Sequence, residues 1–138
     1  MNKINFHIGG GCSIKELQEK FSHMYPFLKI NFFKNEHDSK KYSSQSAEFS
    51  PDVRMNAINN NFSEGELEID DTTTVNGLES KLFEQFGLSG QVSRKSGNLW
   101  LETSLTNHWT LQEQNDQGRE ISPAPHNMIS FREVPYGC

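Results

Sequence analysis

Cysteine is scarce in this chain, and long apolar runs are missing. Only two cysteines occur among 138 residues, Cys12 and Cys138. One bridge between two such near-terminal positions is no disulfide framework, so we expect free thiols. No stretch approaches the roughly 18 apolar residues that a membrane-spanning helix needs, and the first residues lack the apolar run of a signal peptide. We therefore expect a soluble, cytoplasmic protein.

Apolar and basic residues are also few. The apolar share is 33%, and 13 Lys plus Arg stand against 18 Asp plus Glu, which gives a formal net charge of -5. Because such a charge does not attract phosphate backbones or anionic lipid, we expect neither a nucleic-acid nor a membrane partner. The low apolar share predicts an unusually polar stretch, placed at about residues 35–64. This stretch is interpreted either as a mobile loop or as a segment pinned by its scattered apolar residues.

The chain does contain a pattern of strand, helix and strand that occurs twice. Residues 4–8 alternate apolar and polar as a half-buried strand does, Ser13 and Glu16 have the spacing of a helix capping box, and residues 28–32 alternate again. Pro26 is expected to end the first helix and Gly87 the second. The two copies match at a constant offset: Phe6 and Leu67, Ile8 and Ile69, Ser13 and Thr74, Ile14 and Val75, Leu17 and Leu78, Phe21 and Leu82, and Tyr25 and Phe86.

Two β-α-β units with both helices on one face predict an α+β fold. The expected arrangement is a ferredoxin-like sandwich of sheet and helices with strand order 4-1-3-2, and a β-grasp-like arrangement is the alternative. A C-terminal hairpin adds a fifth strand, the capping box at Thr110–Glu113 opens a short helix that Gly118 closes, and residues 128–134 suit an edge strand. We expect a single domain over residues 1–138, with repeat 1 at about 3–34, repeat 2 at about 65–95 and a C-terminal extension at about 96–138.

The hairpin is the most informative place for a binding surface. A two-residue turn at Ser96-Gly97 pairs Ser93 with Trp100 and Arg94 with Leu99. On the Trp100 side of the sheet we place Gln91, Ser93, Lys95, Asn98 and Glu102, and on the side of the helices Val92, Leu99 and Leu101. An aromatic anchor among polar side chains is typical of protein interfaces. In the alternative interpretation, Trp109, Leu111 and the C-terminal segment cover Trp100 and form a second small core.

Cys12 and His7 are the candidates for catalytic chemistry. Cys12 precedes the helix cap Ser13, where the helix N-terminus would stabilise a thiolate, and His7 on the preceding strand would act as a base. Cys12 also occupies a position that packs on Leu17 as a hydrophobic staple, which requires no chemistry. Residues 9–11, three glycines, lack the spacing of a phosphate-binding loop and are interpreted as a tight turn.

The second half of the chain resembles a known family. The similarity lies in Thr74-Val75 to Leu78-Glu79, Phe86-Gly87-Leu88, Arg94-Lys95-Ser96-Gly97-Asn98, Leu99-Trp100-Leu101-Glu102-Thr103, Trp109-Thr110-Leu111 and Glu113-Gln114-Asn115. These segments are similar to those of a family of small uncharacterised bacterial proteins. The resemblance implies a compact α+β domain, and it implies no activity, ligand or catalytic residue.

Together these patterns favour a non-enzymatic binding or regulatory module that acts through the sheet face around Trp100. The binding residues we expect are Trp100, Gln91, Ser93, Lys95, Glu102 and Trp109. We expect another protein or a second copy of the chain as partner and no cofactor, and the spacing of the histidines predicts no metal site. Two alternatives stay open, a small-molecule enzyme with Cys12 as nucleophile and a structural subunit of a larger assembly.

Overall fold

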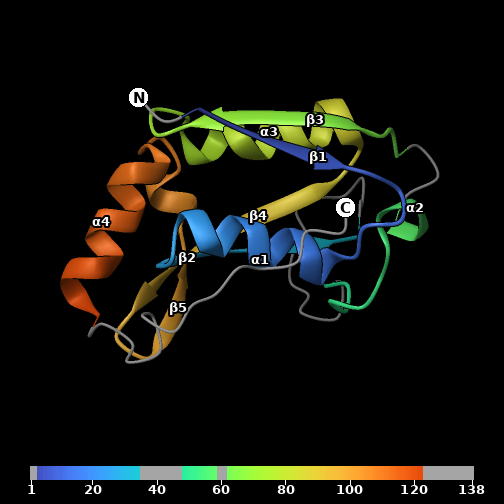
Figure 1. Cartoon of the computed structure of the whole chain (residues 1–138). Coiled ribbons are helices and arrows are strands. Elements are labelled where there is room, and N and C mark those ends of the chain that lie inside the picture. The colour runs from blue at the N-terminus through green and yellow to red at the C-terminus, as the bar shows by residue number, and fades with distance from the viewer. Residues whose placement is uncertain (1–2, 35–47, 59–61, 123–138) are drawn as a thin grey trace.

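The structure, a computed structural model, describes residues 3–34, 48–58 and 62–122. Within these ranges the chain has a mixed α+β fold with two antiparallel sheets and four α-helices (Figure 1). The strands are β1 (Lys3–Ile8), β2 (Leu28–Phe33), β3 (Gly65–Asp70), β4 (Ser89–Ser96) and β5 (Leu99–Glu102). The helices are α1 (Ile14–Met24), α2 (Met55–Ile58), α3 (Val75–Phe86) and α4 (Leu111–Ile121), with a 3-10 helix, η2, at Ser104–Thr106. No helix in the described ranges is long and apolar enough to cross a membrane.

Each of the first two strands pairs with a strand from the second half of the chain. The β1–β3 ribbon places Ile4 opposite Ile69, and β2 pairs with β4 so that Ile30 lies opposite Val92. β5 lies on the other side of β4, which gives the order β2-β4-β5. The expected order 4-1-3-2 contains the β1–β3 contact but not the β2–β4 contact, so the ferredoxin-like arrangement is not confirmed. Apolar alternation determines which face of a strand is buried but not which strand lies beside it.

α1 and α3 both begin at side-chain caps. The hydroxyl of Ser13 accepts a hydrogen bond from the Glu16 N–H at 3.2 Å, and the Glu16 carboxylate accepts one from the Ser13 N–H at 2.9 Å. Thr74 caps α3 by accepting from the Gly77 N–H at 2.9 Å. Gly87 ends α3 with a φ of 73°, the left-handed conformation that glycine adopts without strain. The buried apolar face consists of Ile14, Leu17 and Phe21 in α1 and of Val75, Leu78, Leu82 and Phe86 in α3.

One hydrophobic core joins both sheets to α1 and α3. Residues 48–58 and 62 also take part in it, because Met55 is fully buried and Phe49, Val53, Ile58 and Phe62 pack against the core. The described part of the polar stretch is therefore pinned to the core by its apolar side chains. Residues 35–47 and 59–61 of that stretch lie outside the described residues.

The N-termini of the helices are joined in pairs by backbone hydrogen bonds. Ser13 forms an antiparallel bridge with Arg54, just before α2, and Thr74 forms one with Thr110, just before α4. The N–H groups of Ile14, Met55, Val75 and Leu111 donate to the carbonyl oxygens of Val53, Cys12, Trp109 and Thr73, at 2.9, 2.8, 3.0 and 2.8 Å respectively. The second joint fixes the start of α4 beside the start of α3.

The sequence pattern predicted that Gly118 ends α4, and this prediction is wrong. The helix continues to Ile121, and Gly118 is buried within it. A Cβ atom at this position would lie 2.8 Å from the Cβ atom of Phe27 and 3.3 Å from the Cγ atom of Arg94. The glycine therefore allows α4 to approach β4 and the residue before β2 closely, a packing role that a local sequence signal does not distinguish from a helix stop.

Candidate functional site

The β4–β5 hairpin has a different turn from the predicted one. Residues 97 and 98 form the turn, and Gly97 has a φ of 64°. Lys95 lies opposite Trp100, and Ser93 lies opposite Glu102, so β4 pairs two positions further along β5 than expected. Because a shift of two residues keeps every side chain on its face of the sheet, Trp100 still shares a face with Ser93 and Lys95.

Two lysines contact the indole of Trp100. The Nζ atom of Lys29, from β2, lies 5.3 Å from the ring centroid, and the Nζ atom of Lys95, from β4, lies 5.4 Å from it. Both distances are within the roughly 6 Å over which an ammonium group is attracted to an aromatic ring. Trp100 nevertheless keeps 39% of its surface exposed. The ring is thus held by cations at the surface of the sheet while part of it stays open to solvent.

Lys29 is the residue of this surface that sequence reasoning missed. It lies opposite Ser93, and therefore reaches Trp100 only because β2 pairs with β4. The alternation of β2 marked Lys29 as a polar-side residue, but no sequence signal indicated which strand lies beside it.

The surface holds unpaired charges of both signs. Lys29, Lys95 and Glu102 form no ion pair with any residue in the described ranges. We call Lys29, Ser93, Lys95, Trp100 and Glu102 the Trp100 face. Gln91, also expected here, lies on the same side of β4 one pleat further from Trp100.

β5 is exposed on both of its faces. All four of its residues are exposed, Leu99 at 66% and Leu101 at 40%. Leu99 and Leu101 were expected on the helix side of the sheet, and they do lie on the side opposite Trp100, but no helix covers them. The reason is the position of β5, since α1, α3 and α4 pack on β2 and β4. No described strand other than β4 pairs with β5.

Further apolar side chains surround the hairpin. Leu105, 92% exposed, follows β5 closely in η2, and Ile121, 41% exposed, ends α4. Ile121 is next to Ser122, whose hydroxyl accepts a hydrogen bond from the Gly97 N–H in the hairpin turn at 3.0 Å. Among the described residues, every exposed large apolar side chain except Phe83 therefore belongs to β5 or to the segments next to its ends.

Trp109 lies apart from Trp100 and helps to hold α4 on β4. The Arg94 guanidinium lies 5.6 Å from the centroid of the Trp109 ring, and its Nη1 atom donates to the Gln114 side chain at 2.7 Å. Arg94 alternates with Ser93 and Lys95, so this contact is on the side of the sheet opposite Trp100. Leu111 is fully buried. Neither Trp109 nor Leu111 covers Trp100, and the C-terminal segment lies outside the described residues.

The edge of β4 beyond the end of β5 is closed by side chains. The Val92 N–H donates to Glu79 Oε2 at 3.0 Å, and the Thr103 hydroxyl donates to the Val92 carbonyl oxygen at 2.8 Å. Burial raises the pKa of the Glu79 carboxyl, and the hydrogen bond from Val92 lowers it by a smaller amount. The outer edge of β4 is thereby satisfied at Val92, whereas no described strand pairs with the outer edge of β5.

His7, the candidate base, faces away from the core. It alternates with buried Phe6 and Ile8, and its Nδ1 atom lies 2.8 Å from Glu66 Oε2. Its Nε2 atom lies 3.5 Å from Glu64 Oε2. The hydrogen bond to Glu66 is the largest of the effects that raise the pKa of His7.

Cys12, the candidate nucleophile, lies in the core. It is 2% exposed and disulfide-bonded, so the expectation of a free thiol at this position is wrong. Sequence spacing does not reveal which cysteines a fold brings within bonding distance; Cys138 lies outside the described residues. The structure thus gives Cys12 a buried sulfur and His7 an exposed imidazole.

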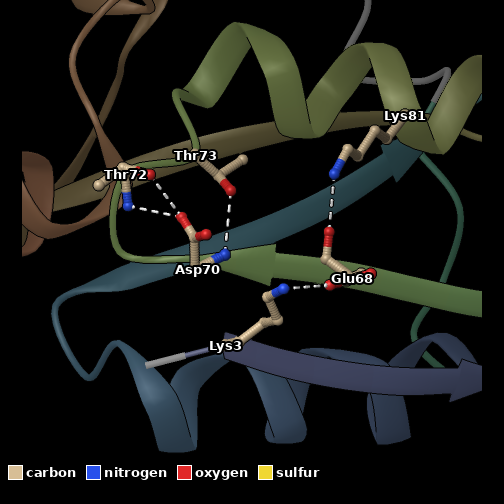
Figure 2. A network of polar contacts seen from close by, with 6 residues as sticks. All are labelled: Lys3, Glu68, Asp70, Thr72, Thr73 and Lys81. Atoms are coloured by element: carbon tan, nitrogen blue, oxygen red, sulfur yellow. Dashed lines mark hydrogen bonds and ion pairs between the residues drawn. The ribbon is translucent and has the colours of Figure 1, made fainter. Parts of the chain in front are cut away.

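The acidic turn after β3 is a structural feature (Figure 2). The Asp70 carboxylate accepts hydrogen bonds from the Thr72 N–H at 2.9 Å and from the Thr72 hydroxyl at 2.6 Å. The Asp70 N–H donates to the Thr73 hydroxyl at 3.0 Å, and Lys3 pairs with Glu68 at 3.1 Å on the neighbouring strand. The hydrogen bonds from Thr72 are the main reason that the pKa of Asp70 is lowered. These contacts fix the turn between β3 and α3.

Within the described ranges, no group of three or more His, Cys, Asp or Glu side chains is placed to hold a metal ion. The chain matches no protein-family model, no curated protein and no solved structure.

Proposed function

We propose that the protein is a non-enzymatic binding module that recognises other polypeptides through β5 and the Trp100 face. The observation that carries this proposal is the exposure of β5, whose apolar side chains are open on both faces and whose outer edge is occupied by no described strand. The backbone N–H and C=O groups along such an edge pair with an added strand. The side chains of that strand would then cover Leu99 and Leu101 on one face and Trp100 on the other.

Trp100 has the properties of an interface anchor. Tryptophan is enriched among the residues that contribute most to binding, and a ring already held in place loses little freedom when a partner covers it. Lys29 and Lys95 provide that restraint through their contacts with the indole. Because neither ammonium group has an acidic partner among the described residues, an acidic group on the incoming strand would find complementary charge here.

We further propose that the chain consists of two copies of one unit, each a strand, helix and strand followed by a second helix. The paired helix N-termini support this, because the same backbone bonds join α1 to α2 and α3 to α4. Gln18 and Glu79, at matching positions in α1 and α3, also bond the backbones of Ile30 and Val92 respectively. The β4–β5 hairpin then has no counterpart in the described part of the first copy, which makes it the addition to a common scaffold.

The binding function is tested by selecting random peptides of about twelve residues, displayed on phage, against the full chain immobilised at low density. We expect selected peptides to lose at least about tenfold in affinity for Trp100→Ala, the loss typical of an interface anchor. Phe83→Ala is the matched control, because Phe83 is an exposed aromatic side chain, 52% exposed, on α3 away from the hairpin. Its peptide affinities should equal those of the wild type.

Two outcomes contradict the proposal. One is a selection that enriches no peptide at all. The other is a set of peptides that bind Trp100→Ala as tightly as the wild type, with circular dichroism showing that both proteins are folded.

A further inference from the structure

We propose that the occupant of the β5 edge is β5 of a second copy of this chain, paired antiparallel about a twofold axis at Leu101. This inference rests on the proposed function and names its partner. The dimer would extend the three-stranded sheet into a continuous sheet of two β2-β4-β5 units joined at β5.

The apolar pattern of β5 favours a strand over a small ligand as the occupant. Leu99 and Leu101 are exposed on one face of the sheet, and Trp100 is exposed on the other. A small molecule on either face would leave the other uncovered, whereas an added strand places side chains on both. With Leu101 at the axis, the Leu101 side chains of the two copies meet on one face, and Trp100 of each copy lies beside Glu102 of the other on the opposite face.

Symmetry restricts how two β5 strands can pair. Directly opposite residues in an antiparallel pair point to the same side of the sheet. Two identical strands related by a twofold axis through the sheet must therefore place one residue opposite its own copy. Near the middle of β5, that residue is either Trp100 or Leu101.

The charges select Leu101. With Trp100 at the axis, the two indoles would meet. Lys29 and Lys95 of both copies would then place four ammonium groups around the two rings. With Leu101 at the axis, Glu102 of each copy lies opposite Trp100 of the other, in the row that continues to Lys95. Glu102, Lys29 and Lys95 have no ion-pair partner among the described residues of their own chain. The second register places Glu102 of one copy beside the Trp100 ring that Lys29 and Lys95 of the other copy contact, so opposite charges flank this ring on both sides of the axis.

The contact is small, because β5 has four residues. Interfaces of stable dimers bury about 800 Å² on each partner, and a four-residue strand with its neighbours supplies less. We therefore expect a reversible dimer whose population rises with protein concentration.

The test is a charge swap followed by sedimentation velocity of the full chain over about 1–500 µM, a range that spans weak association. Lys95→Glu alone places acidic groups on both sides of each Trp100 ring, and Glu102→Lys alone places basic groups on both sides of it. Each variant should weaken dimerisation at least about tenfold, since like charges that flank the same ring oppose association. An equimolar mixture of the two variants should dimerise as the wild type does, because the mixed dimer restores one opposite-charge contact on each side of the axis.

The controls are Lys15→Glu on α1 and Glu84→Lys on α3, which change the same charges at exposed positions outside the hairpin. Both should sediment as the wild type does. A chain that stays monomeric at every concentration overturns the inference, and so do single variants that dimerise normally or a mixture that does not recover. If the chain is monomeric while selected peptides still depend on Trp100, only the second-copy assignment fails. If Trp100→Ala leaves peptide affinity unchanged, the proposed binding function is wrong, whatever the charge swap shows.

Discussion

At the scale of single residues, Glu79 carries a carboxyl group where the matching helix carries an amide. Glu79 accepts from the Val92 N–H, and Gln18 donates to the Ile30 carbonyl oxygen at 2.8 Å. Ile30 and Val92 lie opposite each other in the sheet. Both side chains satisfy backbone groups of the same strand pair, but only Glu79 must lose hydration of a charge to do so, and burial raises its pKa.

We expect Glu79→Gln to increase the free energy of unfolding at neutral pH. The amide keeps an oxygen that accepts from Val92 and removes the buried charge. Because the folded-state pKa lies above the unfolded-state pKa, the cost of ionising Glu79 is absent below the unfolded-state value. This cost grows as the pH rises from the unfolded-state pKa to the folded-state pKa of Glu79, and it is constant at higher pH. Urea unfolding should therefore show a larger gain at about pH 8 than at about pH 4.

The control for this substitution is Glu84→Gln, on the exposed side of the same helix. It removes the same charge without changing a buried group. Its effect on the free energy of unfolding should be small, because Glu84 is exposed. A Glu79→Gln protein that is less stable than the wild type at about pH 8 would show that the charged hydrogen bond to Val92 outweighs the desolvation.

At the scale of elements, the docking of α4 on the sheet depends on Gly118. In an exposed helix, Gly→Ala gains up to about 1 kcal/mol from helix propensity. Here the new Cβ atom would lie 2.8 Å from Phe27 Cβ, so α4 must move away from the sheet. We expect Gly118→Ala to lower the free energy of unfolding by about 1–3 kcal/mol, the usual cost of an overpacked contact.

Thermal and urea unfolding measure this loss, and Glu120→Ala, at an exposed position of α4, is the control. A more stable Gly118→Ala protein would mean that helix propensity decides at this position and that the close approach to Phe27 is easily relieved.

The helices were predictable because their signals are local. Two local signals locate α1, α3 and α4. One is a capping side chain that accepts from the backbone N–H three residues later, and the other is an apolar face at helical spacing. The caps Ser13, Thr74 and Thr110 are confirmed. The hairpin turn was wrong by two residues in register, since Gly97 suits either of two overlapping two-residue turns. The side of the sheet predicted for Trp100 is nevertheless correct, because side chains alternate along a strand with a period of two.

The partners of the strands were not predictable, because they depend on contacts between distant parts of the chain. Lys29 joined the Trp100 face only through the β2–β4 pairing, and the exposure of Leu99 and Leu101 followed from helices that stop short of β5. The separation of the candidate base and nucleophile has a local cause instead. The alternation of residues 4–8 already placed His7 on the outward side of its strand, and the structure adds that Cys12 is buried in the core.

At the scale of the whole molecule, the two sheets share one core, and Leu82 lies in it with no exposed surface. We expect Leu82→Ala to cost about 2–5 kcal/mol of unfolding free energy, the range for a buried leucine. Unfolding followed by far-ultraviolet circular dichroism and by tryptophan fluorescence should give one coincident transition, because neither sheet keeps its apolar face covered without the other.

Phe83→Ala is the neighbouring control: Phe83 is exposed, so its loss should change stability by less than about 0.5 kcal/mol. Two separate transitions in the Leu82→Ala protein would show instead that the β1–β3 ribbon and the three-stranded sheet unfold independently.

The strand pairing of the two halves also determines how the chain must fold. β1 pairs with β3 and β2 pairs with β4, so neither of the two described strands in the first half pairs with the other. A nascent chain that has been synthesised only as far as β2 contains β1, α1 and β2 but neither partner strand. The residues that cover its apolar faces in the folded protein have not yet been made. Contacts of this range are slow to form, on the order of milliseconds to seconds, because long loops must close before any strand pair is gained. Both strands of the first half therefore gain their sheet partners only when β3 and β4 have been synthesised.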